Sequence, residues 1–303
     1  MGIFFLIVYE IESLLSLLGN GYIIVAIGHS WLFSRKMIPC DFLLTALSLS
    51  RFLLQWVSVS SQFAYFRSPE TYLDSKTFLA FGFSWMYLNI ASLWCATWLN
   101  VFYCVKVTNF AHPLFVWLKS RAGVLVPRFL GLSLLAFIIC SIPPILIYFE
   151  EEKHHNLTGN LPENTSQIEA HGNDVFTFLH PLQNYFTAIG FSICLTASLL
   201  VLLSLWRHTR HLEKGRLGTK DFSTQAHLRV MKPLLLLLFF YILHFSAMMI
   251  TLGNVFQYGK LERLISDIVL SSYPSIHSII MIFTNPKLRE LYIHVLNLGR
   301  SAS

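Results

Sequence analysis

Seven long apolar runs divide the sequence, and stretches richer in polar residues separate them. A helix rises about 1.5 Å per residue, so about 20 apolar residues cross a bilayer core about 30 Å thick. Every run reaches that length, and the pattern therefore predicts a single all-α bundle of seven membrane-spanning helices over residues 1–303. The predicted spans are 6–28, 41–63, 77–104, 125–149, 181–206, 233–254 and 261–285.

Basic residues are concentrated in every second connection between the runs. Of the 22 lysines and arginines, 15 lie in these connections and the tail 286–303, whereas five lie in the opposite connections or at the start of run seven. Lysine and arginine accumulate on the cytoplasmic side of membrane proteins. The sequence thus predicts an outside amino terminus and a cytoplasmic tail, the outline of a G-protein-coupled receptor. A fold by itself does not establish a function.

The composition excludes a water-soluble domain. The chain is 54% hydrophobic and only 13% charged, whereas a soluble protein of 303 residues needs a larger charged surface. We therefore expect a multi-pass protein of the plasma membrane, with the lipid bilayer as a partner. The net charge of +6 comes mostly from short connections between spans, which does not suit a nucleic-acid-binding surface.

The connection 150–180 is predicted to be a long extracellular loop. It is acidic, with six carboxylates against one lysine, and it carries glycosylation sequons at Asn156 and Asn164. Both sequons fall on the side that the charge pattern places outside, where glycosylation occurs. None of the five cysteines lies in this connection, so no disulfide can tie it to the third span.

Polar residues within the runs predict an inner polar layer. A charge in the bilayer core is costly, so such groups usually face the bundle interior. Asn20 and Arg51 lie about 12 Å and about 15 Å from the inner ends of their spans, and Ser275 and Ser278 fall at a similar depth. For Arg51 we expect acceptors such as the Asn20 carbonyl, serine hydroxyls or backbone carbonyls near Pro274. We interpret this layer as a structural or switching network rather than a ligand site.

A second polar layer is predicted nearer the outside. Trp85 and Asn89 are one turn apart and share a helix face, Asp267 lies six residues into the seventh run, and Tyr241 lies deeper in the sixth. If these faces point inward, they line a cavity open to the outside. We hypothesise that Trp85 stacks on a flat or cationic ligand and that Asp267 pairs with an amine. The alternative is that Trp85 packs against lipid and that Asp267 is an interfacial carboxylate beside Arg263.

Five stretches agree in order and spacing with one receptor family. They are Trp85–Lys106, His112–Lys119, Ser204–Arg210, Gln225–His227 and Tyr273–Leu288. On these motifs the sequence resembles the taste receptor type 2 family, the bitter taste receptors, over nearly its whole length from Gly19 to Leu288.

The resemblance implies a receptor for small bitter compounds that activates a gustducin-like heterotrimeric G protein and needs no cofactor or metal. It implies that Trp85, Asn89 and Asp267 face the ligand, that Tyr241 is linked to activation, and that Asn20 and Arg51 belong to the inner polar network. The residues that it implies in G-protein coupling are Lys119, Arg207, His208, Arg210 and His227.

Two features depart from the family pattern. Ile90 stands where a histidine usually follows the third-span asparagine, and Lys232-Pro233 opens the sixth run. Because proline suits the first position of a helix, we expect the sixth helix to begin late and the segment 225–232 to be interrupted.

Other functions fit the sequence less well. A channel or transporter would need a polar path or Gly/Pro-interrupted half-repeats, and an enzyme would need a catalytic cluster such as H-E-x-x-H or G-x-S-x-G. An opsin needs a lysine at mid-depth in the seventh span, but Lys287 lies beyond its inner end. The closest alternative is a pheromone-type chemoreceptor, which shares the seven spans.

Overall fold

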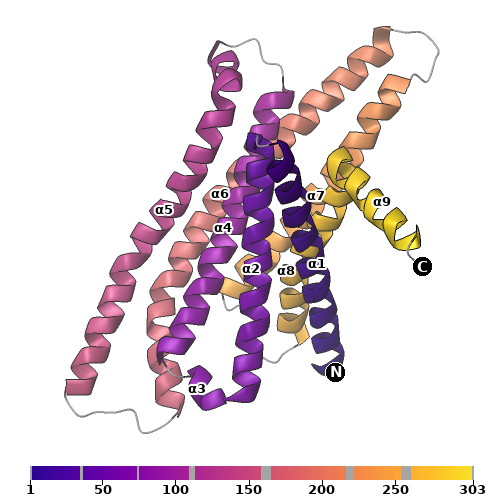
Figure 1. Ribbon diagram of the computed structural model, residues 1–303. Coiled ribbons are helices and arrows are strands. Elements are labelled where there is room, and N and C mark those ends of the chain that lie inside the picture. Colours follow the sequence, from indigo (N-terminus) through magenta and orange to yellow (C-terminus); the bar gives the residue numbers. More distant parts are fainter. Residues whose placement is uncertain are drawn as a thin grey trace.

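The computed structural model describes residues 2–34, 37–73, 75–108, 113–157, 165–215, 222–253 and 261–301, and nearly all of them are helical (Figure 1). Seven of these helices are long and apolar enough to cross a membrane, which confirms the predicted bundle. The seven are α1 (Gly2–Ser34), α2 (Pro39–Arg67), α4 (Ser75–Val107), α5 (Pro113–Leu157), α6 (Thr165–Gly215), α7 (Phe222–Leu252) and α8 (Leu261–Thr284). Two shorter helices are α3 (Pro69–Leu73) and α9 (Pro286–Ser301).

Most helices extend beyond the apolar runs, and the connection 150–180 is not a loop along its whole length. Helix α5 continues to Leu157, and α6 begins at Thr165. Hydropathy marks only the part of a helix that lies in the bilayer core, whereas glutamate and lysine are good helix formers in water. Asn156 therefore lies in the last turn of α5, and Asn164 lies outside the described residues.

The expected late start of the sixth spanning helix is wrong. Helix α7 begins at Phe222, and Pro233 lies inside it. Prolines also lie inside α5, α6 and α8. Membrane helices tolerate interior proline because neighbouring helices and serine or threonine side chains satisfy the backbone groups that it frees.

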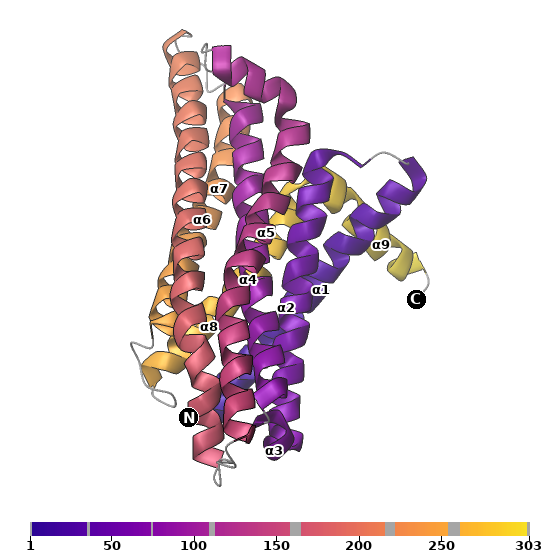
Figure 2. The ribbon, with the colours of Figure 1, turned by 90° about the vertical axis from the view of Figure 1, so that its left-hand side faces the viewer.

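Helix α4 is the centre of the bundle. It packs against α2, α5 and α6, while α8 packs against α1 and α7 and closes the ring. Helix α5 lies on the outside, in front of the other helices in Figure 2, and large apolar side chains such as Leu132 and Ile139 are exposed along it. Ile90, at the position where the resemblance leads one to expect a histidine, is fully buried on α4 within the main apolar core.

Side-chain hydrogen bonds to backbone carbonyls join neighbouring helices. The Thr97 hydroxyl donates to Gly190 O on α6 at 3.1 Å, and the Ser275 hydroxyl donates to Glu12 O on α1 at 2.8 Å. Tyr22 on α1 donates to the first turn of α9. All five cysteines are free thiols, so these contacts and apolar packing hold the helices together.

The seam between α1 and α8 depends on a glycine. A Cβ atom added at Gly19 would lie 2.3 Å from the Ser278 hydroxyl oxygen and 3.0 Å from its Cβ. Small residues at such positions let membrane helices approach closely. Gly28, on the same helix, has no neighbour within 4 Å of an added Cβ.

We expect Gly19→Ala to destabilise the bundle by about 1–3 kcal/mol, because the added methyl group overpacks the α1–α8 seam. Gly28→Ala is the matched control, which we expect to be neutral or slightly stabilising because alanine favours the helix. Thermal unfolding of both variants in detergent measures the difference. Equal melting temperatures would show that this seam has room to relax.

Candidate ligand-binding site

A cavity of about 550 Å³ lies between helices α1, α2, α4, α6, α7 and α8. Its lining extends from Phe78 and Arg263, near the end of the bundle at which α1, α4 and α8 begin, to Arg51 and Pro274 near mid-depth. Cavities of this volume hold small organic molecules. The four predicted ligand-facing residues, Trp85, Asn89, Tyr241 and Asp267, all line it.

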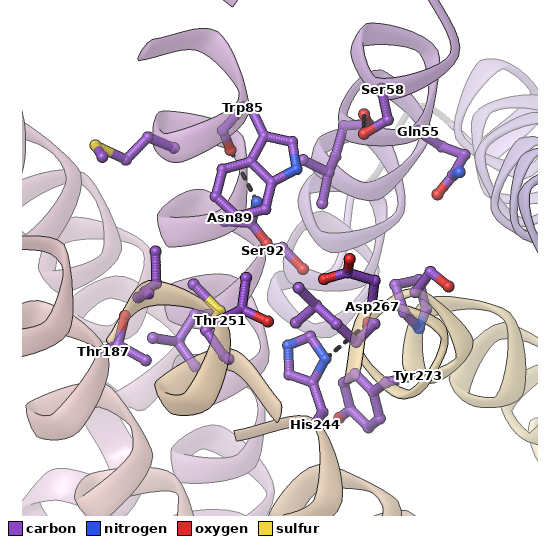
Figure 3. Close-up of a pocket in the computed structure, with 18 of the residues that line it drawn as sticks. Gln55, Ser58, Trp85, Asn89, Ser92, Thr187, His244, Thr251, Asp267 and Tyr273 are labelled. Atoms are coloured by element: carbon purple, nitrogen blue, oxygen red, sulfur yellow. Dashed lines mark hydrogen bonds between the residues drawn. The ribbon is translucent and has the colours of Figure 1, made fainter. Parts of the chain in front are cut away.

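One wall of the cavity is a face of α4. Trp85, Asn89 and Ser92 follow one another along this face, as Figure 3 shows. Asn89 is buried and donates its side-chain amide to the Trp85 carbonyl at 2.9 Å, which fixes the orientation of the side chain. This wall therefore presents an indole ring beside an amide and a hydroxyl.

An aromatic cluster from three helices forms the facing wall. The rings of Tyr241 and Tyr273 are 5.7 Å apart, and Tyr241 stacks on Phe191 of α6 at 5.4 Å. His244 lies 4.9 Å from the Tyr273 ring and is held by a hydrogen bond of 3.0 Å between its Nδ1 atom and Leu270 O (Figure 3). Aromatic pairs at these distances stabilise their own arrangement, so the wall is preformed.

Asp267 lines the cavity close to the start of α8 and is already paired. Its carboxylate lies 3.2 Å from the Nε atom of Arg263, one turn earlier on the same helix. Arg263 is buried and also donates to Thr251 O at 3.0 Å, which ties α8 to α7. Asp267 therefore both pairs with Arg263 and lines the cavity, so the two alternatives expected from the sequence occur at the same time. An amine ligand would have to share Asp267 with Arg263.

Arg51 lines the same cavity instead of a separate inner layer. Its Nε atom donates to Ser92 Oγ at 3.1 Å, and its guanidinium lies 4.9 Å from the centre of the Tyr273 ring. The expected serine acceptor is present, but it comes from α4. Counting depth along a helix gives the height of a side chain and not the direction in which it points, so the two layers could not be separated from the sequence.

The other three residues of the predicted inner network do not bond to Arg51. Asn20 donates to Ser16 O in its own helix at 2.9 Å. Ser275 bonds to the α1 backbone, and Ser278 bonds to Ser275 O. These contacts stabilise the α1–α8 seam, whereas Arg51 bridges α2, α4 and α8.

Sequence reasoning missed several lining residues. His244 is an ionisable group inside an apolar run, a signal that marks interior positions in membrane proteins, and Tyr273 precedes the proline of α8. No signal in the sequence distinguishes Gln55, Ser58 and Thr187 from other polar residues in their helices, because only the packing shows which way they face.

The predicted coupling residues lie at the opposite end of the bundle, where α5 begins and α6 ends. Lys119 lies in the second turn of α5, and its backbone carbonyl accepts a hydrogen bond from Lys106 on α4. Arg207 and Arg210 are exposed on α6, and the Arg210 guanidinium stacks 4.2 Å above the Trp206 ring. The backbones of His208 and His227 lie in α6 and α7, and their side chains lie outside the described set.

The chain is similar to known receptors over nearly its whole length. A family model described as taste receptor protein (TAS2R) matches residues 1–300. The chain is 32% identical to taste receptor type 2 member 8 of Gorilla gorilla gorilla, over 98% of this chain and 96% of the relative. It is 33% identical to taste receptor type 2 member 40 of Gallus gallus, over 97% of this chain and 94% of that relative.

Proposed function

Since this chain belongs to the taste receptor family TAS2R, we propose that small bitter compounds bind in its six-helix cavity and cause the bundle to activate a gustducin-like heterotrimeric G protein. It is a G-protein-coupled bitter taste receptor, a multi-pass protein of the plasma membrane, and a receptor rather than an enzyme. The family match favours a taste receptor over a pheromone-type chemoreceptor.

The proposal rests on one observation. Four residues expected to face a ligand line the same cavity: Trp85, Asn89, Tyr241 and Asp267. These residues come from α4, α7 and α8, so a single bound molecule contacts three helices. A ligand shifts a two-state equilibrium only when it binds one state more tightly than the other. Contacts to three separate helices provide that difference, because a change in their relative positions alters the fit of the molecule between them.

We expect Trp85→Ala to raise the half-maximal concentration of aromatic bitter agonists at least ten-fold, since the indole ring forms much of one cavity wall. Trp56→Ala is the matched control, because Trp56 is 59% exposed on α2 and does not line the cavity. A calcium assay with a panel of bitter compounds, corrected for surface expression, measures both variants. If the half-maximal concentration changed equally in the two variants, the agonist would bind outside this cavity.

The cavity end of the bundle is proposed to face the outside of the cell. The end of α5, with Asn156 in its last turn, and the start of α6 lie at this end, whereas the basic stretch at the end of α6 lies at the other. This arrangement follows the positive-inside rule and gives soluble bitter compounds direct access to the cavity.

Glycosylation tests this orientation. We expect a glycosidase to increase the mobility of the protein from intact cells, and the shift to disappear when Asn156→Gln and Asn164→Gln are combined. Each single variant shows which sequon is occupied. A wild-type protein whose mobility does not change would remove the support that the sequons give to this orientation.

The opposite end is proposed to contact the G protein. Lys119, Arg207, His208, Arg210 and His227 belong to helices α5, α6 and α7, whose ends at this face lie away from the cavity. Exposed arginines on a continuous helix suit an acidic or polar partner surface, and electrostatic complementarity speeds association.

We expect the double variant Arg207→Ala/Arg210→Ala to reduce G-protein activation several-fold without changing agonist binding, because both side chains are exposed and neither lines the cavity. Arg67→Ala, an exposed arginine at the cavity end, is the control. Nucleotide exchange on a gustducin-like α subunit measures the effect. A double variant with wild-type exchange would exclude these arginines from the coupling surface.

A further inference from the structure

Arg51 has one terminal nitrogen without a partner in the cavity wall. The residue is only 1% exposed, and its Nη1 atom makes no hydrogen bond with any described residue. A guanidinium remains charged in proteins, so the cation cannot be removed by deprotonation. A buried charge that lacks partners is costly, and in a membrane span such groups mark functional sites.

The contacts that Arg51 does make leave its charge uncompensated. Ser92 accepts one hydrogen bond, and Tyr273 provides a ring face at 4.9 Å. Within the part of the chain that the structure describes, no carboxylate lies within ion-pair distance of Arg51. Asp267 is the carboxylate among the lining residues, and it is engaged by Arg263. The inner end of the cavity therefore carries a net positive charge.

A further donor without a partner lines the same cavity. The hydroxyl group of Thr187, a residue that is 1% exposed, makes no hydrogen bond with a described residue. Thr187 belongs to α6, whereas Arg51 belongs to α2. Two helices thus place buried donors in the lining of one cavity, and buried donors are normally satisfied.

We propose that the inner end of this cavity binds the carboxylate of a small aromatic acid, with Arg51 as its main partner and the Thr187 hydroxyl as a second donor. Arginine forms strong charge-assisted hydrogen bonds with carboxylates. The apolar body of such a ligand fits the rest of the lining, which includes Trp85, Leu93, Phe245 and Met248. This inference rests on the proposed function because it assigns a ligand class to the same cavity.

Binding is tested on the purified full-length receptor by thermal shift, with benzoate, 2-naphthoate and biphenyl-4-carboxylate as probes and their methyl esters as matched neutral compounds. We expect at least one acid to stabilise the wild type at a concentration at least ten-fold lower than its ester, since hydrogen bonds to a buried charge are strong. If every acid and its ester act alike, the proposal is overturned.

Arg51→Gln should remove the preference for the acid, and Arg128→Gln, which changes an exposed arginine of α5 outside the cavity, should keep it. Because Arg51→Gln could impair folding, Thr187→Val provides a second test that keeps the shape of the side chain and removes only the hydroxyl. It should weaken acid binding several-fold and leave ester binding unchanged. Thr196→Val, at an exposed threonine of α6, is its control. An acid preference that is undiminished in Thr187→Val and in a folded Arg51→Gln overturns the proposal.

The acid-binding site and the proposed receptor signalling are tested by separate measurements. Thermal shift reports binding without signalling, whereas calcium responses to neutral bitter compounds report signalling without the acid site. Responses to neutral compounds together with no acid preference would overturn the acid site alone. Acid binding without any cellular response would overturn the proposed signalling and leave the acid site in place.

Discussion

The bilayer offers no hydrogen bonds to a polar group, and the rest of this structure depends on that constraint. Each spanning segment is helical because a helix satisfies its own backbone. Serine and threonine hydroxyls in the spans donate to carbonyls, either one turn back, as Ser141 does, or on a neighbouring helix, as Thr97 does. Arg51 is one of the buried residues whose hydrogen-bonding groups the described residues do not fully satisfy, and it lines the cavity.

The seven spans could be predicted from the sequence because apolar runs report bilayer thickness directly. Their ends could not, because glutamate-rich segments continue as helix in water, and Pro233 does not start α7 because the preceding turns are helical as well. The residues of the site were recognised better than their arrangement. Trp85 and Asn89 share a face by spacing alone, whereas the place of Arg51 beside Ser92 depends on how α2 is rotated against α4.

The central position of α4 explains how one helix serves both as core and as ligand wall. Buried apolar residues of α4 such as Ile90 belong to the main apolar core of the bundle. The face of α4 toward the cavity carries the indole, amide and hydroxyl groups. Helix α5, which packs at the periphery, contributes no residue to the cavity lining and is free to face lipid.

The five free thiols have a consequence for the conditions under which this receptor keeps its shape. Because none of the cysteines lies in the connection between α5 and α6, no disulfide can join it to the third span. Packing and hydrogen bonds alone therefore hold the described helices together around the cavity. The assembly of the bundle does not wait for an oxidation step.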